Sequence, residues 1–215
     1  MTDVRDQDEI ILENGVVAGN FYDKYATANP IAKHLMDNFF KSIRELVTMS
    51  GSCEIHEVGC GEGHLSRLLA KMVPNIRGSD FSQQVIEKAN RLSQSEGVHV
   101  PFRAVSIYNL QSSEDAAELI VCCEVLEHLE DPEEALRILS QLAKPYLIVS
   151  VPREPLWRLL NMARGKYIGS LGNTPGHINH WSLKQFIKLI SSSFDIIEVR
   201  TPLPWSVVFC RAKSL

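Results

Sequence analysis

The chain has 215 residues, of which 45% are hydrophobic and 22% charged, as is average for a soluble globular domain. Its formal charge of −4 argues against a general attraction to nucleic acid or anionic membranes. The five cysteines show neither a CxxC pair nor zinc spacing, and the acidic start MTDVRDQDEI does not resemble a signal peptide. We therefore expect a cytoplasmic protein with reduced cysteines, no membrane span and no nucleic-acid partner.

The first 50 residues are predicted to form an N-terminal helical cap. Residues 1 to 18 are polar and acidic and are expected to form a flexible arm or a short first helix. From Ile31 to Leu46, apolar residues recur at spacings of three and four. Pro30 suits a helix start and Gly51 a helix end, so this stretch predicts a helix.

Strand-like and helix-like segments then alternate along the chain. The strand-like segments are CEIHEVG, NIRGSD, VHVPFRAVS, AAELIVCCEVL and YLIVSVP, followed by the closing pair FDIIEVR and SVVFCRAK. The helix-like segments are HLSRLLAKMV, SQQVIEKANRLSQ, DPEEALRILSQLA and SLKQFIKLISSS. This alternation predicts one α/β domain over residues 1–215, with a doubly wound, seven-stranded, mostly parallel sheet and an antiparallel C-terminal strand.

The segment EVGCGEG lies where the first strand of the alternating series meets its helix, the place at which such sheets bind ligands. Its glycines, Gly59, Gly61 and Gly63, let a ligand approach the backbone. Their GxGxG spacing differs from the dinucleotide pattern GxGxxG, and Glu57 would repel a pyrophosphate, so a cationic ligand fits better. Asp80, at the end of the next strand, could accept both hydroxyls of an unphosphorylated ribose.

At these motifs the sequence resembles the class I S-adenosylmethionine-dependent methyltransferases, in the small-molecule, ubiquinone-pathway-like (methyltransferase type 11) branch. EVGCGEG, SDFS, CCEVLEHLEDP and GHINHWSLKQF carry the resemblance, closely over residues 50–151 and more loosely over 177–200. It implies a Rossmann-like fold, S-adenosylmethionine as cofactor and S-adenosylhomocysteine as product. The family often has an acid where Ser106 stands, and a hydroxyl there can still bond adenine.

The resemblance also implies which residues contact the cofactor. In resembling enzymes an aromatic N-terminal segment closes over it, which would involve Tyr22 and Tyr25, although simple packing of these rings on the domain is an equal alternative. The complete set of expected contacts is Tyr22, Tyr25, Glu57, Gly59, Cys60, Gly61, Gly63, Asp80, Phe81, Ser106, Ile107, Cys123 and Glu124.

Three histidines, His128, His177 and His180, are the candidates for a catalytic base, with Glu127 and Glu124 as weaker ones. Each also has a purely structural alternative, such as capping a strand or ordering a loop. His177 and His180 form an HxxH pair, but no third ligand is apparent, so we expect no metal.

Residues 152–181 are predicted to be less regular in structure and to form an inserted lid on the substrate side. The stretch from 152 to 180 has four basic residues and one acid, 4 − 1 = +3, together with apolar side chains and four glycines. An amphipathic, basic cover suggests an acceptor that is apolar with an anionic part. The alternative is the solvated face of a packed helix.

The sequence therefore predicts an enzyme, monomeric or homodimeric, that moves a methyl group to an O, C or N atom of a small metabolite. The alternatives are a methyltransferase acting on RNA or protein and a non-catalytic S-adenosylmethionine-binding regulatory module. A nicotinamide oxidoreductase comes last, because both the glycine spacing and Glu57 are wrong for it.

Overall fold

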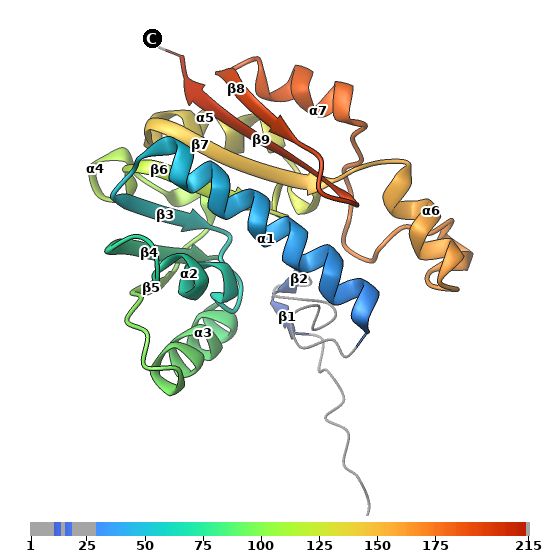
Figure 1. Cartoon of the computed structure of the whole chain (residues 1–215), viewed down its shortest axis with the longest axis horizontal. Coiled ribbons are helices and arrows are strands. Elements are labelled where there is room, and N and C mark those ends of the chain that lie inside the picture. The colour runs from blue at the N-terminus through green and yellow to red at the C-terminus, as the bar shows by residue number, and fades with distance from the viewer. Residues whose placement is uncertain (1–10, 14–15, 19–28, 214–215) are drawn as a thin grey trace, which may run out of the picture.

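The computed structural model describes residues 11–13, 16–18 and 29–213 (Figure 1). Its strands are β1 (Ile11–Glu13), β2 (Val16–Ala18), β3 (Glu54–Val58), β4 (Asn75–Asp80), β5 (Phe102–Ala104), β6 (Ala117–Cys123), β7 (Ala143–Pro152), β8 (Phe194–Arg200) and β9 (Trp205–Ala212). Its α-helices are α1 (Pro30–Ser50), α2 (His64–Leu69), α3 (Gln83–Ser95), α4 (Ser112–Asp115), α5 (Pro132–Leu142), α6 (Leu156–Ala163) and α7 (Leu183–Ile190). Three 3₁₀-helices complete the set: η1 (Ile107–Asn109), η2 (Leu126–His128) and η3 (Ile168–Ser170).

A seven-stranded sheet in the order β5-β4-β3-β6-β7-β9-β8 forms the centre of the molecule. The pairs among β3 to β7 are parallel, whereas β9 runs antiparallel to both of its neighbours, β7 and β8. This confirms the predicted fold class, including the antiparallel strand at the C-terminal end of the chain.

Helices pack on both faces of the sheet. Apolar side chains of α1 and α2 join one buried cluster, and those of α5 and α7 join the other (Figure 1). Strand β6 contributes to both, since Leu119 and Val121 belong to the first cluster and Ile120 and Cys122 to the second. Burial on both faces explains why this strand is almost continuously apolar in the sequence.

The predicted helix termini are confirmed for the two helices with the strongest end signals. The side chain of Asn29 accepts hydrogen bonds from the first backbone amides of α1, and the helix ends at Gly51 with a φ of 65°. Asp131 caps α5 through the amide of Glu134, with Pro132 at the first helical position.

Two predictions need correction. Residues 11–13 and 16–18 form an antiparallel strand pair, β1 with β2, instead of an arm or a first helix. The intervening dipeptide is Asn-Gly, which is typical of two-residue hairpin loops, so the sequence carried the signal. The segment 152–181 is also more regular than expected, because it contains α6 and η3.

No helix within the described residues is long and apolar enough to cross a membrane. Helix α1 has 21 residues, but five of them are charged.

Candidate active site

The carboxyl ends of four neighbouring parallel strands, β5, β4, β3 and β6, bring most of the predicted cofactor residues together. Because the chain leaves β3 in one direction to form β4 and β5 and later returns to place β6 on its other side, this is the topological switch point of the sheet. Ligands in doubly wound folds bind in the crevice at such a point.

The glycine loop between β3 and α2 is held by the backbone of β4. The amides of Gly59 and Cys60 both donate to the carbonyl oxygen of Ser79, at 2.7 and 2.9 Å, and Gly63 donates to the carbonyl of Cys60 at 2.9 Å. Gly59, Gly61 and Gly63 all have positive φ, at 75°, 53° and 71°. The loop thus uses conformations that other residues adopt only with strain.

The three glycines differ in what surrounds them. A Cβ added at Gly59 would lie 2.2 Å from a methyl carbon of Val125, and one at Gly63 would lie 2.4 Å from the Phe102 ring. A Cβ at Gly61 would have no described atom within 4 Å. Gly59 and Gly63 are therefore required for packing, whereas Gly61 borders a space that a ligand can enter.

Asp80 fixes the other edge of this space. Its Oδ2 accepts a hydrogen bond from the amide of Gly61 at 2.9 Å, and its Oδ1 accepts one from the amide of Ser82 at 3.1 Å. Each carboxylate oxygen has a second lone pair, which suits the two hydroxyls of a ribose. The open flank of Gly61 beside a fixed carboxylate therefore fits the nucleoside part of S-adenosylmethionine.

Glu57, at the end of β3, is buried and accepts a hydrogen bond from the hydroxyl of Ser66 in α2. Burial, together with the smaller effect of the nearby Asp80 charge, raises the pKa of Glu57 to about 8, against the opposing effect of the Ser66 hydrogen bonds. In the absence of a positively charged ligand, this carboxyl group therefore carries a proton at neutral pH. A cationic group beside it would favour ionisation.

The remaining predicted cofactor residues lie at the ends of β4 and β5. Phe81 is partly exposed directly after Asp80. Ser106 caps η1 by accepting a hydrogen bond from the amide of Tyr108 at 3.4 Å, and Ile107 is buried. The predicted Tyr22 and Tyr25 lie outside the described residues.

At the end of β6, Glu124 adopts a positive φ of 59°, a strained conformation for a residue with a side chain. Its carboxylate accepts hydrogen bonds from the indole of Trp205 at 2.7 Å and the hydroxyl of Ser150 at 3.3 Å. The preceding Cys123 is half-buried, and burial raises its thiol pKa well above the usual value, so the thiol is neutral. No pattern in the sequence marked Ser66, Ser150 and Trp205 as site residues. Each lies on a different element from the carboxylate to which it donates, so no local motif connects the two.

Beyond Glu124, the chain brings together Glu127, His128 and His177, whose potential ligand atoms all lie within 4.8 Å of one another. The two imidazole rings meet edge to face with their centroids 4.8 Å apart. His180 is not a member of this group, and its Nε2 instead pairs with the side-chain oxygen of Asn173 at 2.7 Å. The HxxH pair is therefore not the unit that the fold assembles.

His177 reaches this place because its loop docks onto η2. The amides of Ile178 and Asn179 both donate to the carbonyl oxygen of Glu127, at 2.9 and 3.0 Å. The side-chain amide of Asn179 donates to the carbonyl of Leu129 at 2.6 Å. On the other side, the ring of Trp157 from α6 stacks on His177 with centroids 6.0 Å apart.

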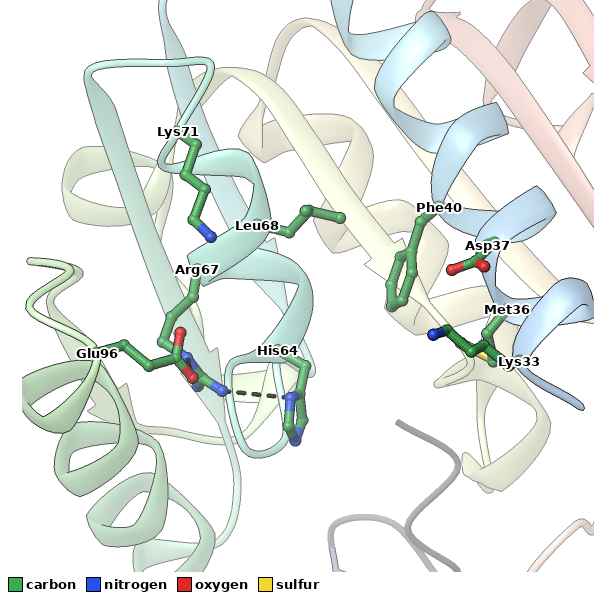
Figure 2. A pocket seen from close by; sticks show the side chains of 9 residues that line it. All are labelled: Lys33, Met36, Asp37, Phe40, His64, Arg67, Leu68, Lys71 and Glu96. Atoms are coloured by element: carbon green, nitrogen blue, oxygen red, sulfur yellow. Dashed lines mark hydrogen bonds and ion pairs between the residues drawn. The ribbon is translucent and has the colours of Figure 1, made fainter. Parts of the chain in front are cut away.

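A separate hollow of about 240 Å³ lies between α1 and α2 (Figure 2). It is lined by Lys33, Met36, Asp37, Phe40, His64, Arg67, Leu68, Lys71 and Glu96. The wall residue Arg67 donates to the carbonyl of Glu62 at 2.6 Å and pairs with Glu96 at 3.0 Å. The hollow contains no predicted site residue, but its arginine braces the glycine loop at Glu62.

Comparison with known proteins agrees with this geometry. A family model described as "Methyltransferase domain" matches residues 56–149. A ubiquinone biosynthesis O-methyltransferase of Coxiella burnetii (strain RSA 331 / Henzerling II) is 26% identical over 182 residues, which cover 75% of this chain and 76% of that protein.

Solved structures show the same fold. The magnesium protoporphyrin IX methyltransferase of Synechocystis PCC 6803 with bound SAH superposes with a TM-score of 0.66 at 20% identity, covering 87% of this chain and 89% of the other. The same enzyme with bound SAM gives a TM-score of 0.63 at 17% identity, covering 87% and 86%.

Proposed function

Because the chain belongs to the class I S-adenosylmethionine-dependent methyltransferases, it is an enzyme that uses this cofactor, and we propose that it methylates a hydroxyl oxygen of a small, partly apolar metabolite. The observation that carries this proposal is the cluster of Glu127, His128 and His177, whose first two members follow Cys123 and Glu124 directly after β6.

A hydroxyl is a weak nucleophile until it loses its proton, so its methylation needs a group that assists this loss. The histidines of the cluster are suited to this task because imidazole exchanges protons near neutral pH. His128 is half-buried and His177 buried, so both can act on a substrate shielded from bulk water. We assign the acceptor oxygen to the space beside these rings, and we assign no part in the reaction to His180.

The opposite side of the site is assigned to the cofactor, which when bound supplies an electrophilic methyl group. Asp80 is positioned to accept the ribose hydroxyls, and the backbone at Gly61 to receive the ligand closely. We place its amino-acid end near Glu57, whose ionised form would pair with the ammonium group. Alignment of the methyl carbon with the acceptor oxygen then governs the rate, as in any in-line displacement.

The segment 153–181 indicates the class of acceptor. Its four basic residues and one acid leave it positively charged in an acidic chain. It also exposes large apolar side chains, with Leu159 at 53%, Ile168 at 62% and Leu171 at 65% exposure. An acceptor with an apolar body and an anionic group matches both properties, and the ubiquinone-pathway relative supports a hydroxyl as the reacting group.

The test is an acceptor screen with purified protein and methyl-labelled S-adenosylmethionine. The panel pairs alkyl-substituted phenols and catechols bearing a carboxylate with analogues in which the reacting hydroxyl is replaced by hydrogen or an amine. We expect labelled methoxy products from the hydroxylated members alone. Methylation of the amine analogues, or label transferred only to RNA or protein, would overturn the proposal.

A further inference from the structure

The geometry points to a divalent metal site formed by Glu127, His128 and His177. We propose that an ion held there binds the acceptor's hydroxyl oxygen. The existence of the site is independent of the substrate, whereas the ion's role in the reaction rests on the proposed function.

The three side chains offer one carboxylate oxygen and two imidazole nitrogens, the donor set of many catalytic zinc sites and of other divalent transition-metal sites that keep open positions. Their ligand atoms lie within 4.8 Å of one another. In a tetrahedral site, two ligands at about 2.1 Å from the ion lie about 3.4 Å apart. The widest pair therefore needs to close by at most about 1.4 Å, which rotation of the side chains can supply.

The burial of the group favours a cation. Glu127 is only 1% exposed and His177 9%, while His128 is half-buried and keeps a side toward solvent. Two neutral imidazoles and one carboxylate carry a net charge of −1, which a divalent ion complements. Moving a carboxylate out of water is unfavourable unless positive charge or hydrogen bonds compensate for it.

The hydrogen bonding of His128 is that of a metal ligand. Its Nδ1 lies 2.9 Å from the carbonyl oxygen of Gly176. Because a carbonyl oxygen only accepts, Nδ1 carries a proton, and in the neutral ring Nε2 is then the nitrogen that can coordinate a metal. Metal-binding histidines usually donate their second nitrogen to a carbonyl or carboxylate in this way.

The third ligand is held just as firmly. The two backbone hydrogen bonds from Ile178 and Asn179 to the Glu127 carbonyl tie the histidine loop directly to the carboxylate residue. Trp157, which stacks on His177, is fixed by its indole hydrogen bond to Thr174 at 2.9 Å. Ligands from positions 127, 128 and 177 are thus positioned by contacts that do not themselves need the ion.

A bound divalent ion would lower the pKa of a coordinated hydroxyl, so that its proton leaves to solvent. The oxygen lone pair then forms the new O–C bond as the C–S bond of the sulfonium breaks and sulfur keeps that electron pair. With an ion bound, this assistance replaces direct proton acceptance by the histidines, which then act as neutral ligands.

The experiment is a calorimetric titration of the chelator-treated, full-length protein with Zn²⁺ alone. We expect about one ion per chain in the wild type, and Glu127→Gln or His177→Gln should weaken binding at least about 100-fold, because a direct ligand matters more than the outer groups whose loss costs 10–100-fold. His180→Gln and His99→Gln are the matched controls, with one histidine in the HxxH pair and the other exposed, and both should retain wild-type affinity.

A second readout avoids dependence on the variants. Adding Co²⁺ to the metal-free wild type should produce visible ligand-field absorption that saturates near one equivalent and disappears when Zn²⁺ is added. Absence of saturable binding by both methods would overturn the metal site, as would equal affinity in the Glu127 and His177 variants.

The reaction separates this proposal from the one on which it rests. If hydroxylated acceptors are methylated at the full rate by metal-free protein that does not bind Zn²⁺, the metal proposal fails and the hydroxyl acceptor stands. If the ion binds in one equivalent but only amine analogues are methylated, the site stands and the role of the ion in ionising a hydroxyl fails.

Discussion

The glycine loop between β3 and α2 and the segment 153–181 form two sides of the candidate site, but different interactions hold them. The loop is fixed by the adjacent strand end, through the carbonyl of Ser79 and the carboxylate of Asp80. The segment is fixed by a docking contact about fifty positions away in the chain, where Ile178 and Asn179 bond to Glu127.

The two sides therefore differ in how directly the sequence determines their structure. The cofactor side follows from short motifs at the ends of consecutive strands, which the parallel sheet necessarily places side by side. The acceptor side depends on which loop packs against η2. The first should therefore tolerate changes in the second, and the predictions below test this independence.

The largest expected effect is on the acceptor side. His177→Asn should lower kcat by about 100-fold or more, because assistance of proton loss contributes about 10²- to 10⁴-fold. The dissociation constant of S-adenosylmethionine should change by less than about threefold, since the lost group acts on the other substrate. His99→Asn, at an exposed histidine, is the matched control for steady-state kinetics and calorimetry. A parallel loss of cofactor affinity would break the distinction between the two sides.

Gly61→Val should weaken S-adenosylmethionine binding by about 100-fold or more, because the new side chain fills the ligand's approach. Its φ of 53° makes the variant less stable by only about 1–2 kcal/mol. Gly59→Ala should instead reduce stability more than cofactor affinity. Its Cβ would meet Val125, and overpacking adds about 1–3 kcal/mol to the same backbone strain. Denaturant unfolding and calorimetry together check the pair, and wild-type cofactor affinity in Gly61→Val would refute the loop assignment.

Asp80→Ala should weaken cofactor binding by about 1.5–3 kcal/mol, the usual value for hydrogen bonds to a charged group. Part of this loss reflects the Gly61 amide, which also bonds to Asp80. Asp195→Ala, at an exposed aspartate of β8, is the control. Unchanged affinity of Asp80→Ala by calorimetry would show that the ribose lies elsewhere.

The smallest effect, at most about tenfold for each pH unit, is a pH dependence at Glu57. Its pKa of about 8 means that the free protein carries a proton there at pH 7, and an ammonium group bound nearby would release it. Cofactor affinity should therefore rise by up to about tenfold per pH unit between pH 6 and 8, with proton release seen in buffers of different ionisation enthalpy.

In the unliganded protein, the raised pKa of Glu57 makes the folded state less stable as the pH rises. The ordinary value is 4.5, so between there and about 8 the unfolded chain gives up a proton that the folded one retains. Glu57→Gln should remove both effects. A cofactor affinity independent of pH in the wild type would contradict the placement of the ammonium group.

The doubly wound fold class and the positions of Glu57, Gly61 and Asp80 at strand ends could be predicted from the sequence, because strand–helix alternation and glycine spacing are local signals. The cluster of Glu127, His128 and His177 could not be predicted in this way. The HxxH spacing suggested a pairing of His177 with His180, whereas the fold pairs His177 with His128, 49 positions earlier.

Two of the missed groups bond to Glu124 from other strands of the sheet. Trp205 and Ser150 hold the Glu124 carboxylate from β9 and β7, strands whose register no short motif specifies. The signal that could have found the cluster is the adjacent pair Glu127-His128 directly after an apolar strand. The strand end alone places these side chains beside the cofactor motif.

The most direct test of the account is to identify the methylated atom. Wild-type protein should be incubated with methyl-labelled S-adenosylmethionine and a catechol bearing an alkyl chain and a carboxylate, and the product analysed by mass spectrometry and NMR. We expect a single labelled methyl group on oxygen. A methyl group on carbon or nitrogen would contradict it.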